Sequence, residues 1–140
     1  MKDFKLTDHF WLREFRVSWR FPELAEALNP TPVQINNMYF QCATILEPVR
    51  RYLGCPIYIS RGFASPELNA AVGGSDISLH MRAKATDAWA EDTDRTFGIY
   101  EFIQTKLPYA FSQLIYYVGD NFVHSALPHP GYDQFTEIRA

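Results

Sequence analysis

Two potential metal ligands lie close together in the middle of the chain. His80 and Asp87 are separated by six residues, and Asp87 lies within the apolar run ATDAW. Imidazole nitrogens and carboxylate oxygens are common zinc ligands, and a catalytic zinc usually has three protein ligands and one open position. The pair therefore predicts part of a zinc site, whose third ligand must come from elsewhere in the chain.

Three other histidines could supply that third ligand. His124 lies within the apolar segment FVHSAL, whereas His9 lies in an aromatic N-terminal segment and His129 lies between two prolines. A histidine buried in a sheet needs a polar partner or a metal, which favours His124. A single histidine is more often a surface or hydrogen-bonded residue than a ligand, so spacing alone leaves both interpretations open.

The surrounding residues resemble the M15 family of zinc peptidases. The chain has N-A-A-V-G-G at residues 69–74, S-L-H at residues 78–80 and then Asp87, matching the family pattern N-x-x-V-G-G, S-x-H and a later aspartate. The segments LTDHFWLREF, LEPVRRYLG, SQLIYY and FVHSAL extend the resemblance over nearly the whole chain. The family includes D-Ala-D-Ala carboxypeptidases and phage L-alanyl-D-glutamate endolysins, so the resemblance implies their fold, which hedgehog domains share.

The resemblance also implies a function and a set of site residues. His80, Asp87 and His124 would bind Zn²⁺, and the protein would cleave peptidoglycan stem peptides with a zinc-activated water. The residues expected to contact the substrate are Arg61, Ser65, Asn69 and Ser78. For Ser78, an ordinary role in a turn is an equal alternative.

Two departures from the family pattern concern substrate binding and the backbone. The family arginine that would hold a substrate carboxylate or carbonyl is replaced by Ala64. Arg61 lies three residues earlier and could substitute for it. The family glycine between the two ligands is Ala83, a mild change unless this residue needs a positive φ.

A third departure concerns the catalytic acid or base. The family carboxylate that takes a proton from water is replaced by Tyr117, and the acid that other members carry is replaced by Asn121. If Asp120 and Asn121 form a two-residue loop, Tyr117 lies directly opposite His124. A phenol is a poor base at neutral pH but could orient water or stabilise an oxyanion. Asp120 is the nearest carboxylate, although turn carboxylates are more often solvated. The alternative function is therefore a binding or structural module that keeps the zinc site without turnover.

Composition limits the class of protein. The chain has 140 residues, 47% hydrophobic content and net charge −3, which predicts one globular domain over residues 1–140. The sequence has no run of basic residues that would indicate nucleic-acid binding, and no apolar stretch approaches the length of a membrane span. The segment MKDFKLTDHF lacks the apolar part of a secretory signal, so we expect synthesis in the cytoplasm. An enzyme that acts on the cell wall would then have to be released from the cell, as phage-encoded enzymes are. Cys42 and Cys55 are expected to be reduced.

The pattern of apolar residues and breakers predicts an α+β fold, in which a small, mainly antiparallel sheet has helices packed on one side. Residues 4–18 are expected to form a short helix or turns with Thr7 as N-cap. A long helix is expected to begin after Thr31 and to kink near Pro48. The other expected elements are helices at 23–28, 66–72 and 94–106, strands at 57–60 and 85–90, a hairpin of 113–118 and 122–127, and an edge strand at 135–138.

Overall fold

A mixed five-stranded sheet forms the centre of the computed structural model, which describes residues 1–140. Its strands lie in the order β3-β4-β6-β5-β7. Their bounds are β3 (Tyr58–Arg61), β4 (Ala85–Trp89), β5 (Gln113–Tyr117), β6 (Phe122–Ala126) and β7 (Phe135–Arg139). Neighbouring strands are antiparallel except β5 and β7, which are parallel. The expected α+β class with a mainly antiparallel sheet is confirmed.

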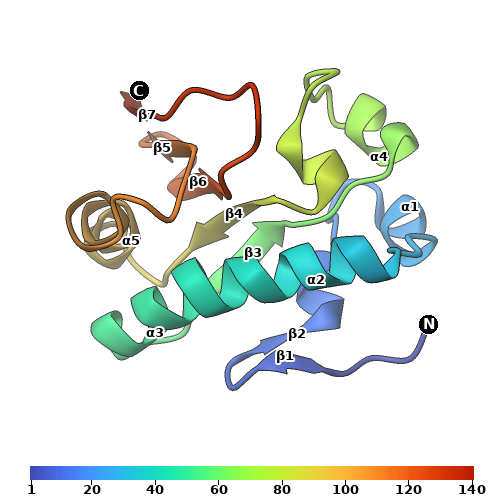
Figure 1. Ribbon diagram of the computed structural model, residues 1–140, viewed down its shortest axis with the longest axis horizontal. Coiled ribbons are helices and arrows are strands. Elements are labelled where there is room, and N and C mark those ends of the chain that lie inside the picture. The colour runs from blue at the N-terminus through green and yellow to red at the C-terminus, as the bar shows by residue number, and fades with distance from the viewer.

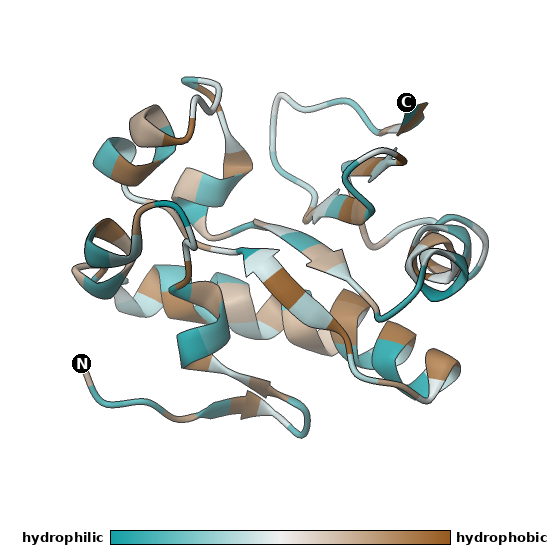
Figure 2. Ribbon diagram, turned by 180° about the vertical axis from the view of Figure 1, so that it is seen from behind, coloured by the Kyte–Doolittle hydropathy of each residue, from teal (hydrophilic) through white to brown (hydrophobic).

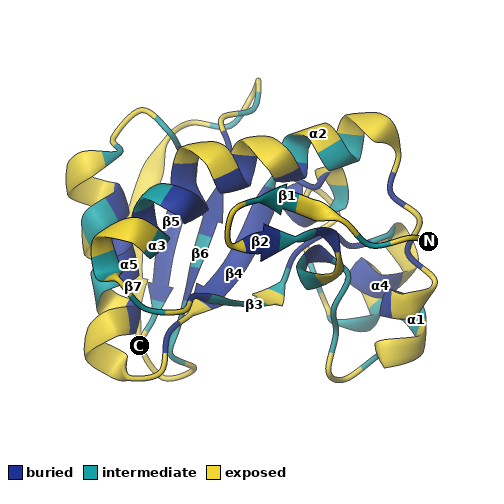
Figure 3. Cartoon of the chain, turned by 90° about the horizontal axis from the view of Figure 1, so that it is seen from below, coloured by how far each residue is buried: buried dark blue, intermediate teal, exposed yellow.

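The longer helices pack on one face of this sheet. The helices are α1 (Pro22–Glu26), α2 (Pro32–Gln41), α3 (Glu47–Leu53), α4 (Pro66–Ala71) and α5 (Thr93–Lys106). Figure 3 shows α2 and α3 lying across one face of the sheet, where Ala88 and Val123 join the buried core. In the view from behind, β3 and β4 lie in front of α2 (Figure 2). Because strand side chains alternate, Asp87 and His124 project from the opposite face.

A π-helical turn joins α2 to α3, so the two helices form one rod (Figure 1). Thr31 caps α2 as expected, accepting a hydrogen bond from the backbone N–H of Gln34. The π turn (Cys42–Leu46) ends where the N–H of Glu47 donates to the carbonyl of Cys42, just before Pro48. A wider turn relieves the clash that a proline causes in a regular helix, so the π turn accommodates Pro48. None of the helices combines the length and the apolar character that a membrane span requires.

The N-terminal segment differs in part from the expected short helix or turns. It forms a short hairpin of β1 (Lys5–Thr7) and β2 (Phe10–Trp11), followed by a 3₁₀ turn, η1 (Leu12–Phe15). The expectation that Thr7 is an N-cap is wrong, because its hydroxyl donates to Oε1 of Glu47 at 2.8 Å. Tertiary contacts with a buried carboxylate thus outweigh the local helical pattern.

The β5–β6 hairpin has a longer turn than the expected two residues. Residues 118–121 form the turn, and Asn121 adopts a left-handed conformation with φ 53°. The register consequently pairs Tyr117 with Phe122 and Ile115 with His124. The expectation that Tyr117 lies directly opposite His124, which assumed a two-residue loop, is therefore wrong. Tyr117 still projects from the same face, because the register differs by an even number of residues.

Candidate metal centre

One row of paired residues crosses three strands on the face away from the long helices. Arg61 of β3 pairs with Asp87 of β4, and Asp87 pairs with His124 of β6. Directly opposite residues of antiparallel strands project from the same face of a sheet. Strand register therefore brings a cation, a carboxylate and an imidazole together from three separate parts of the sequence.

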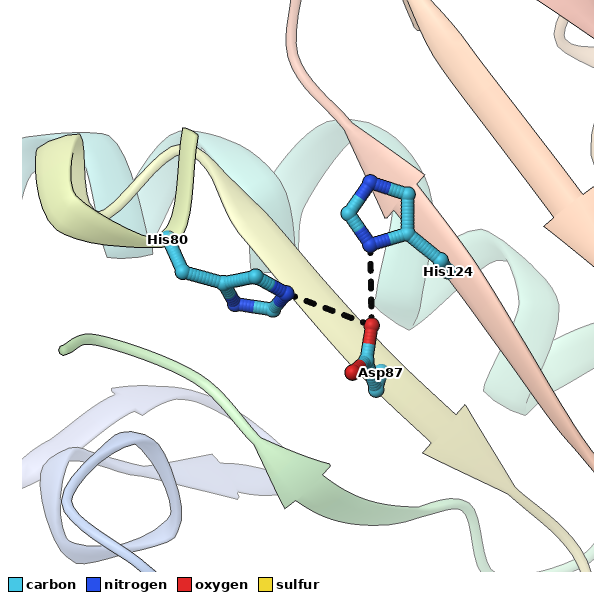
Figure 4. Close-up of side chains that lie close together, drawn as sticks. All are labelled: His80, Asp87 and His124. Carbon is cyan, nitrogen blue, oxygen red and sulfur yellow. Dashed lines mark hydrogen bonds and ion pairs between the residues drawn. The ribbon is translucent and has the colours of Figure 1, made fainter. Parts of the chain in front are cut away.

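His80 reaches this row from outside the sheet. It lies in the 3₁₀ turn η3 (Leu79–Arg82), which begins at Ser78, whose Oγ accepts a hydrogen bond from the His80 N–H at 3.2 Å. Ala83 ends the turn in a left-handed conformation with φ 55° and leads into β4. The family glycine at this position thus corresponds to a backbone that favours glycine, and the chain tolerates alanine there. As Figure 4 shows, the His80 ring points toward Asp87.

The His80 ring presents a bare nitrogen to the site. Its Nδ1 lies 2.7 Å from the carbonyl oxygen of Gly62. A carbonyl can only accept, so Nδ1 carries the hydrogen and Nε2 keeps its lone pair. His80 is 2% exposed, and Nε2 is buried without a hydrogen-bond partner, 3.3 Å from Oδ1 of Asp87. A buried nitrogen without a partner is costly unless something else binds it.

His124 completes the cluster. Its Nδ1 lies 2.9 Å from Oδ1 of Asp87, and its Nε2 lies 2.9 Å from Oε1 of Gln113. Sequence reasoning did not identify Gln113. It lies on β5 in register with Ala126, so only the strand pairing reveals that it shares a face with His124.

The protonation states of the cluster suit a cation. Burial alone would raise the pKa of Asp87, but the nearby His80 ring and the hydrogen bond with His124 outweigh burial and hold the pKa well below its ordinary value. Burial lowers the pKa of His80, although the charge of Asp87 opposes the shift. An ionised carboxylate and a neutral imidazole are the forms that bind metals.

The geometry also fits a metal ion. One ligand atom from each of His80, Asp87 and His124 lies within 4.8 Å of the others. Atoms bound to a tetrahedral zinc at about 2.0–2.1 Å lie about 3.4 Å apart, close to the 3.3 Å between His80 and Asp87. Two imidazoles and a carboxylate are a donor set that zinc accepts. The donor set and the partnerless Nε2 of His80 therefore identify a candidate metal site.

The cluster forms one wall of a cavity of about 380 Å³ that is open to solvent. Its polar lining includes Arg61, Ser78, Tyr117 and Asp120 in addition to the cluster. Tyr132 and Ile77 also line the cavity, and the Tyr132 hydroxyl donates to the carbonyl of Ile77 at 2.6 Å. A substrate in this cavity would therefore contact the cluster and several groups capable of hydrogen bonding.

Two of the four expected substrate contacts are linked to each other. Nη2 of Arg61 donates to Oδ1 of Asn69 at 2.7 Å, and the Asn69 amide donates to the Ser75 carbonyl at 3.0 Å. A side chain at Gly74 would lie 2.1 Å from Oδ1 of Asn69, so this packing requires glycine. Asn69 is buried and does not line the cavity, whereas Arg61 does, and its Nε is buried without a partner. Asn69 thus supports Arg61.

The two expected serines act as helix caps. The Oγ of Ser65 accepts a hydrogen bond from the N–H of Leu68 at the start of α4, and Ser65 does not line the cavity. Ser78 caps η3 and lines the cavity. Backbone capping accounts for both residues, and only Ser78 is also close to a potential substrate.

The two expected catalytic residues differ in their surroundings. The Tyr117 hydroxyl accepts a hydrogen bond from Nη1 of Arg139 at 3.0 Å, and its ring stacks on Phe122 with centroids 4.5 Å apart. Burial raises the pKa of Tyr117, which makes the phenolate that could act as a base still scarcer at neutral pH. Asp120 lies in the exposed turn after β5, and apart from Asp87 it is the only carboxylate that lines the cavity.

The fold and the site define an α+β domain with a candidate metal site that faces an open cavity. A sequence model described as peptidase M15 matches residues 9–126. The chain therefore belongs to the M15 peptidase family, which supports a metal-dependent peptidase activity. No curated protein matches the chain.

Proposed function

We propose that this protein is a zinc-dependent peptidase that cleaves the stem peptides of peptidoglycan. The observation that carries the proposal is the buried, partnerless Nε2 of His80, 3.3 Å from the Asp87 carboxylate in an open cavity. A purely structural cluster would be expected to satisfy this nitrogen. Membership of the M15 family supplies the reaction class.

The residues of the site have distinct roles in this proposal. His80, Asp87 and His124 hold the ion. Bound zinc supplies a Lewis acid that generates a nucleophile from water and polarises a carbonyl. Asp120 takes the proton and returns it to the leaving amine, because it is the remaining carboxylate of the cavity. Arg61 lines the cavity and binds a carbonyl or carboxylate of the substrate through guanidinium N–H groups that Asn69 does not occupy.

The substrate lies in the cell wall, so the protein must reach it from its site of synthesis. We propose that it does so by release from the cell, as phage-encoded wall enzymes do.

Tyr117 has a supporting role in this proposal. It stabilises an oxyanion or orients water while Arg139 holds its hydroxyl.

A second function, a wall-binding module without turnover, is favoured by one observation. The family position of the general base holds Tyr117, whose hydroxyl is bonded to Arg139. If Asp120 lies too far from the reacting carbonyl, the site would bind a stem peptide and leave it intact. The Tyr117→Glu variant tests this, because it places a carboxylate at the family position. Activity gained by this variant from an inactive parent would show that only the base is missing.

Metal content is the first test. Elemental analysis of the purified protein should give about one zinc per chain. Asp87→Ala should abolish binding, whereas Asp133→Ala, which removes an exposed carboxylate elsewhere, should leave it unchanged. A parent protein without zinc after incubation with the ion would sink the proposed metal site.

Turnover is the second test. Zinc-loaded protein should release new amino groups from peptidoglycan fragments, and mass spectrometry of the products identifies the bond. Asp120→Asn should reduce the rate by about 10²–10⁴-fold with unchanged zinc affinity, as expected for loss of a general base. Intact fragments with measurable binding would support the module without turnover instead.

A further inference from the structure

The ring of His124 has an oxygen in front of each nitrogen. Nδ1 faces Oδ1 of Asp87 and Nε2 faces Oε1 of Gln113, each at 2.9 Å. Both oxygens accept hydrogen bonds, whereas a neutral imidazole has only one N–H to donate. An ion at Nδ1 removes the conflict, because the nitrogen lone pair then faces the ion and the single hydrogen on Nε2 donates to Gln113.

Gln113 occupies this position because of the sheet. It lies on β5 two residues before Ile115, which pairs with His124, so its side chain reaches His124 diagonally on the same face. The side chain is half-buried and lines the cavity. The arrangement parallels that of His80, whose Nδ1 is held by the carbonyl of Gly62. Each histidine thus has one nitrogen directed at the cluster and the other fixed by an oxygen.

We propose that Gln113 is the positioning residue for His124. Its amide oxygen selects the tautomer with hydrogen on Nε2, which leaves Nδ1 free to bind the ion. The inference rests on the metal site proposed above. Because the zinc cluster needs both histidines in the correct tautomer, Gln113 controls metal affinity without being a ligand.

Zinc affinity of three variants tests the proposal. Dissociation constants come from competition with a chromophoric chelator. Gln113→Leu removes the acceptor and should weaken zinc binding about 10–100-fold. Gln113→Glu still accepts from Nε2–H and should bind at least as tightly as the parent. Gln104→Leu, the same change on the exposed side of α5, should leave affinity unchanged. Unchanged affinity in Gln113→Leu, or an equal loss in the Leu and Glu variants, would overturn the proposal.

The tautomer itself provides a readout that needs no variant. Two-bond ¹H–¹⁵N spectra of the zinc-loaded parent should show hydrogen on Nε2 of His124, and hydrogen on Nδ1 would contradict the proposal even if Gln113→Leu fails to fold. The two proposals fail differently. A parent that binds no zinc overturns both, whereas a parent that binds zinc with affinity independent of Gln113 overturns only the positioning role.

Discussion

Two buried carboxylates in this protein lie next to histidines but differ in how fully the surrounding polar groups are hydrogen-bonded. Glu47 is 4% exposed and Asp87 is 9% exposed. Glu47 accepts hydrogen bonds from the Thr7 hydroxyl at 2.8 Å, from the His9 N–H at 2.7 Å and from His9 Nδ1 at 2.8 Å. Asp87 has one hydrogen-bond partner in His124, while His80 Nε2 remains without one.

The difference lies in which groups around the carboxylate can donate. Around Glu47 a hydroxyl, a backbone N–H and an imidazole all donate, so the cluster is closed and fixes the N-terminal hairpin to α3. At His80, the single N–H of the neutral ring, on Nδ1, donates to the Gly62 carbonyl. The other nitrogen, Nε2, therefore has only a lone pair to offer. Both clusters contain a carboxylate and a histidine, so residue types alone do not distinguish them. What distinguishes the Asp87 cluster is that Nδ1 of His80 donates to the Gly62 carbonyl.

The sharpest test of this contrast is the response of stability to zinc. The parent should gain about 2.7–4.1 kcal/mol in free energy of unfolding at zinc concentrations 100–1,000 times the dissociation constant. His80→Ala should remove this gain, whereas His9→Ala should keep it because His9 belongs to the closed cluster. Urea unfolding with and without zinc provides the measurement. Equal gains in the two variants would mean that the clusters do not differ as described.

Removing the carboxylate of the closed cluster should affect folding alone. Glu47→Ala leaves the donors of Thr7 and His9 without their acceptor, so we expect a loss of about 2–4 kcal/mol in free energy of unfolding. Glu47→Gln keeps one acceptor oxygen and should lose less. Zinc affinity measured on the folded variants should match that of the parent. A Glu47 variant with normal stability and weakened zinc binding would reverse the assignment.

Acid should weaken the two clusters of the zinc-free protein over different ranges. Burial lowers the pKa of His80 from 6.5, so the stability from its neutral ring is present above pH 6.5 and declines as the pH falls below that value. Burial opposes the lowered pKa of Glu47, but hydrogen bonds from His9 and Thr7 outweigh it, so its contribution declines only below pH 4.5.

Unfolding measured across pH separates these contributions. His80→Ala should flatten the decline that begins near pH 6.5, and Glu47→Gln should flatten only the part below pH 4.5. If both variants changed the same range, the assignment of the two declines to separate clusters would be wrong.

Much of the fold follows from local sequence signals. Thr31 and Ser65 start α2 and α4 as side-chain caps, Pro32 occupies the first turn of α2, and Gly54 ends α3 in a left-handed backbone conformation. The N-terminal hairpin could not be predicted in this way. Its stability depends on Glu47, some forty residues away, and no local pattern reveals that partner.

The site was only partly predictable for a similar reason. His80, Asp87 and His124 are brought together by the structure, as the motif implies. Gln113 was missed because its role depends on the β5–β6 register, and the register depends on a four-residue turn with Asn121 in a left-handed conformation. The position of Arg61 on the same face likewise required its pairing with Asp87.

The smallest expected effect concerns the turn that carries His80 to Asp87. Ala83 has φ 55° and is fully buried, so Ala83→Gly relieves a left-handed conformation that costs an L-residue about 1–2 kcal/mol. Glycine also adds about 0.5–1 kcal/mol of chain entropy to the unfolded state, and loss of the buried methyl opposes the gain further. We therefore expect a change within about 1 kcal/mol and unchanged zinc affinity, read from urea unfolding and chelator competition. Ala83→Val places a β-branched residue at a positive φ and should destabilise the turn clearly more. If Ala83→Gly weakened zinc binding instead, the methyl group of Ala83 would have to hold His80 in place. The backbone turn alone would then not explain the geometry of the His80–Asp87–His124 cluster.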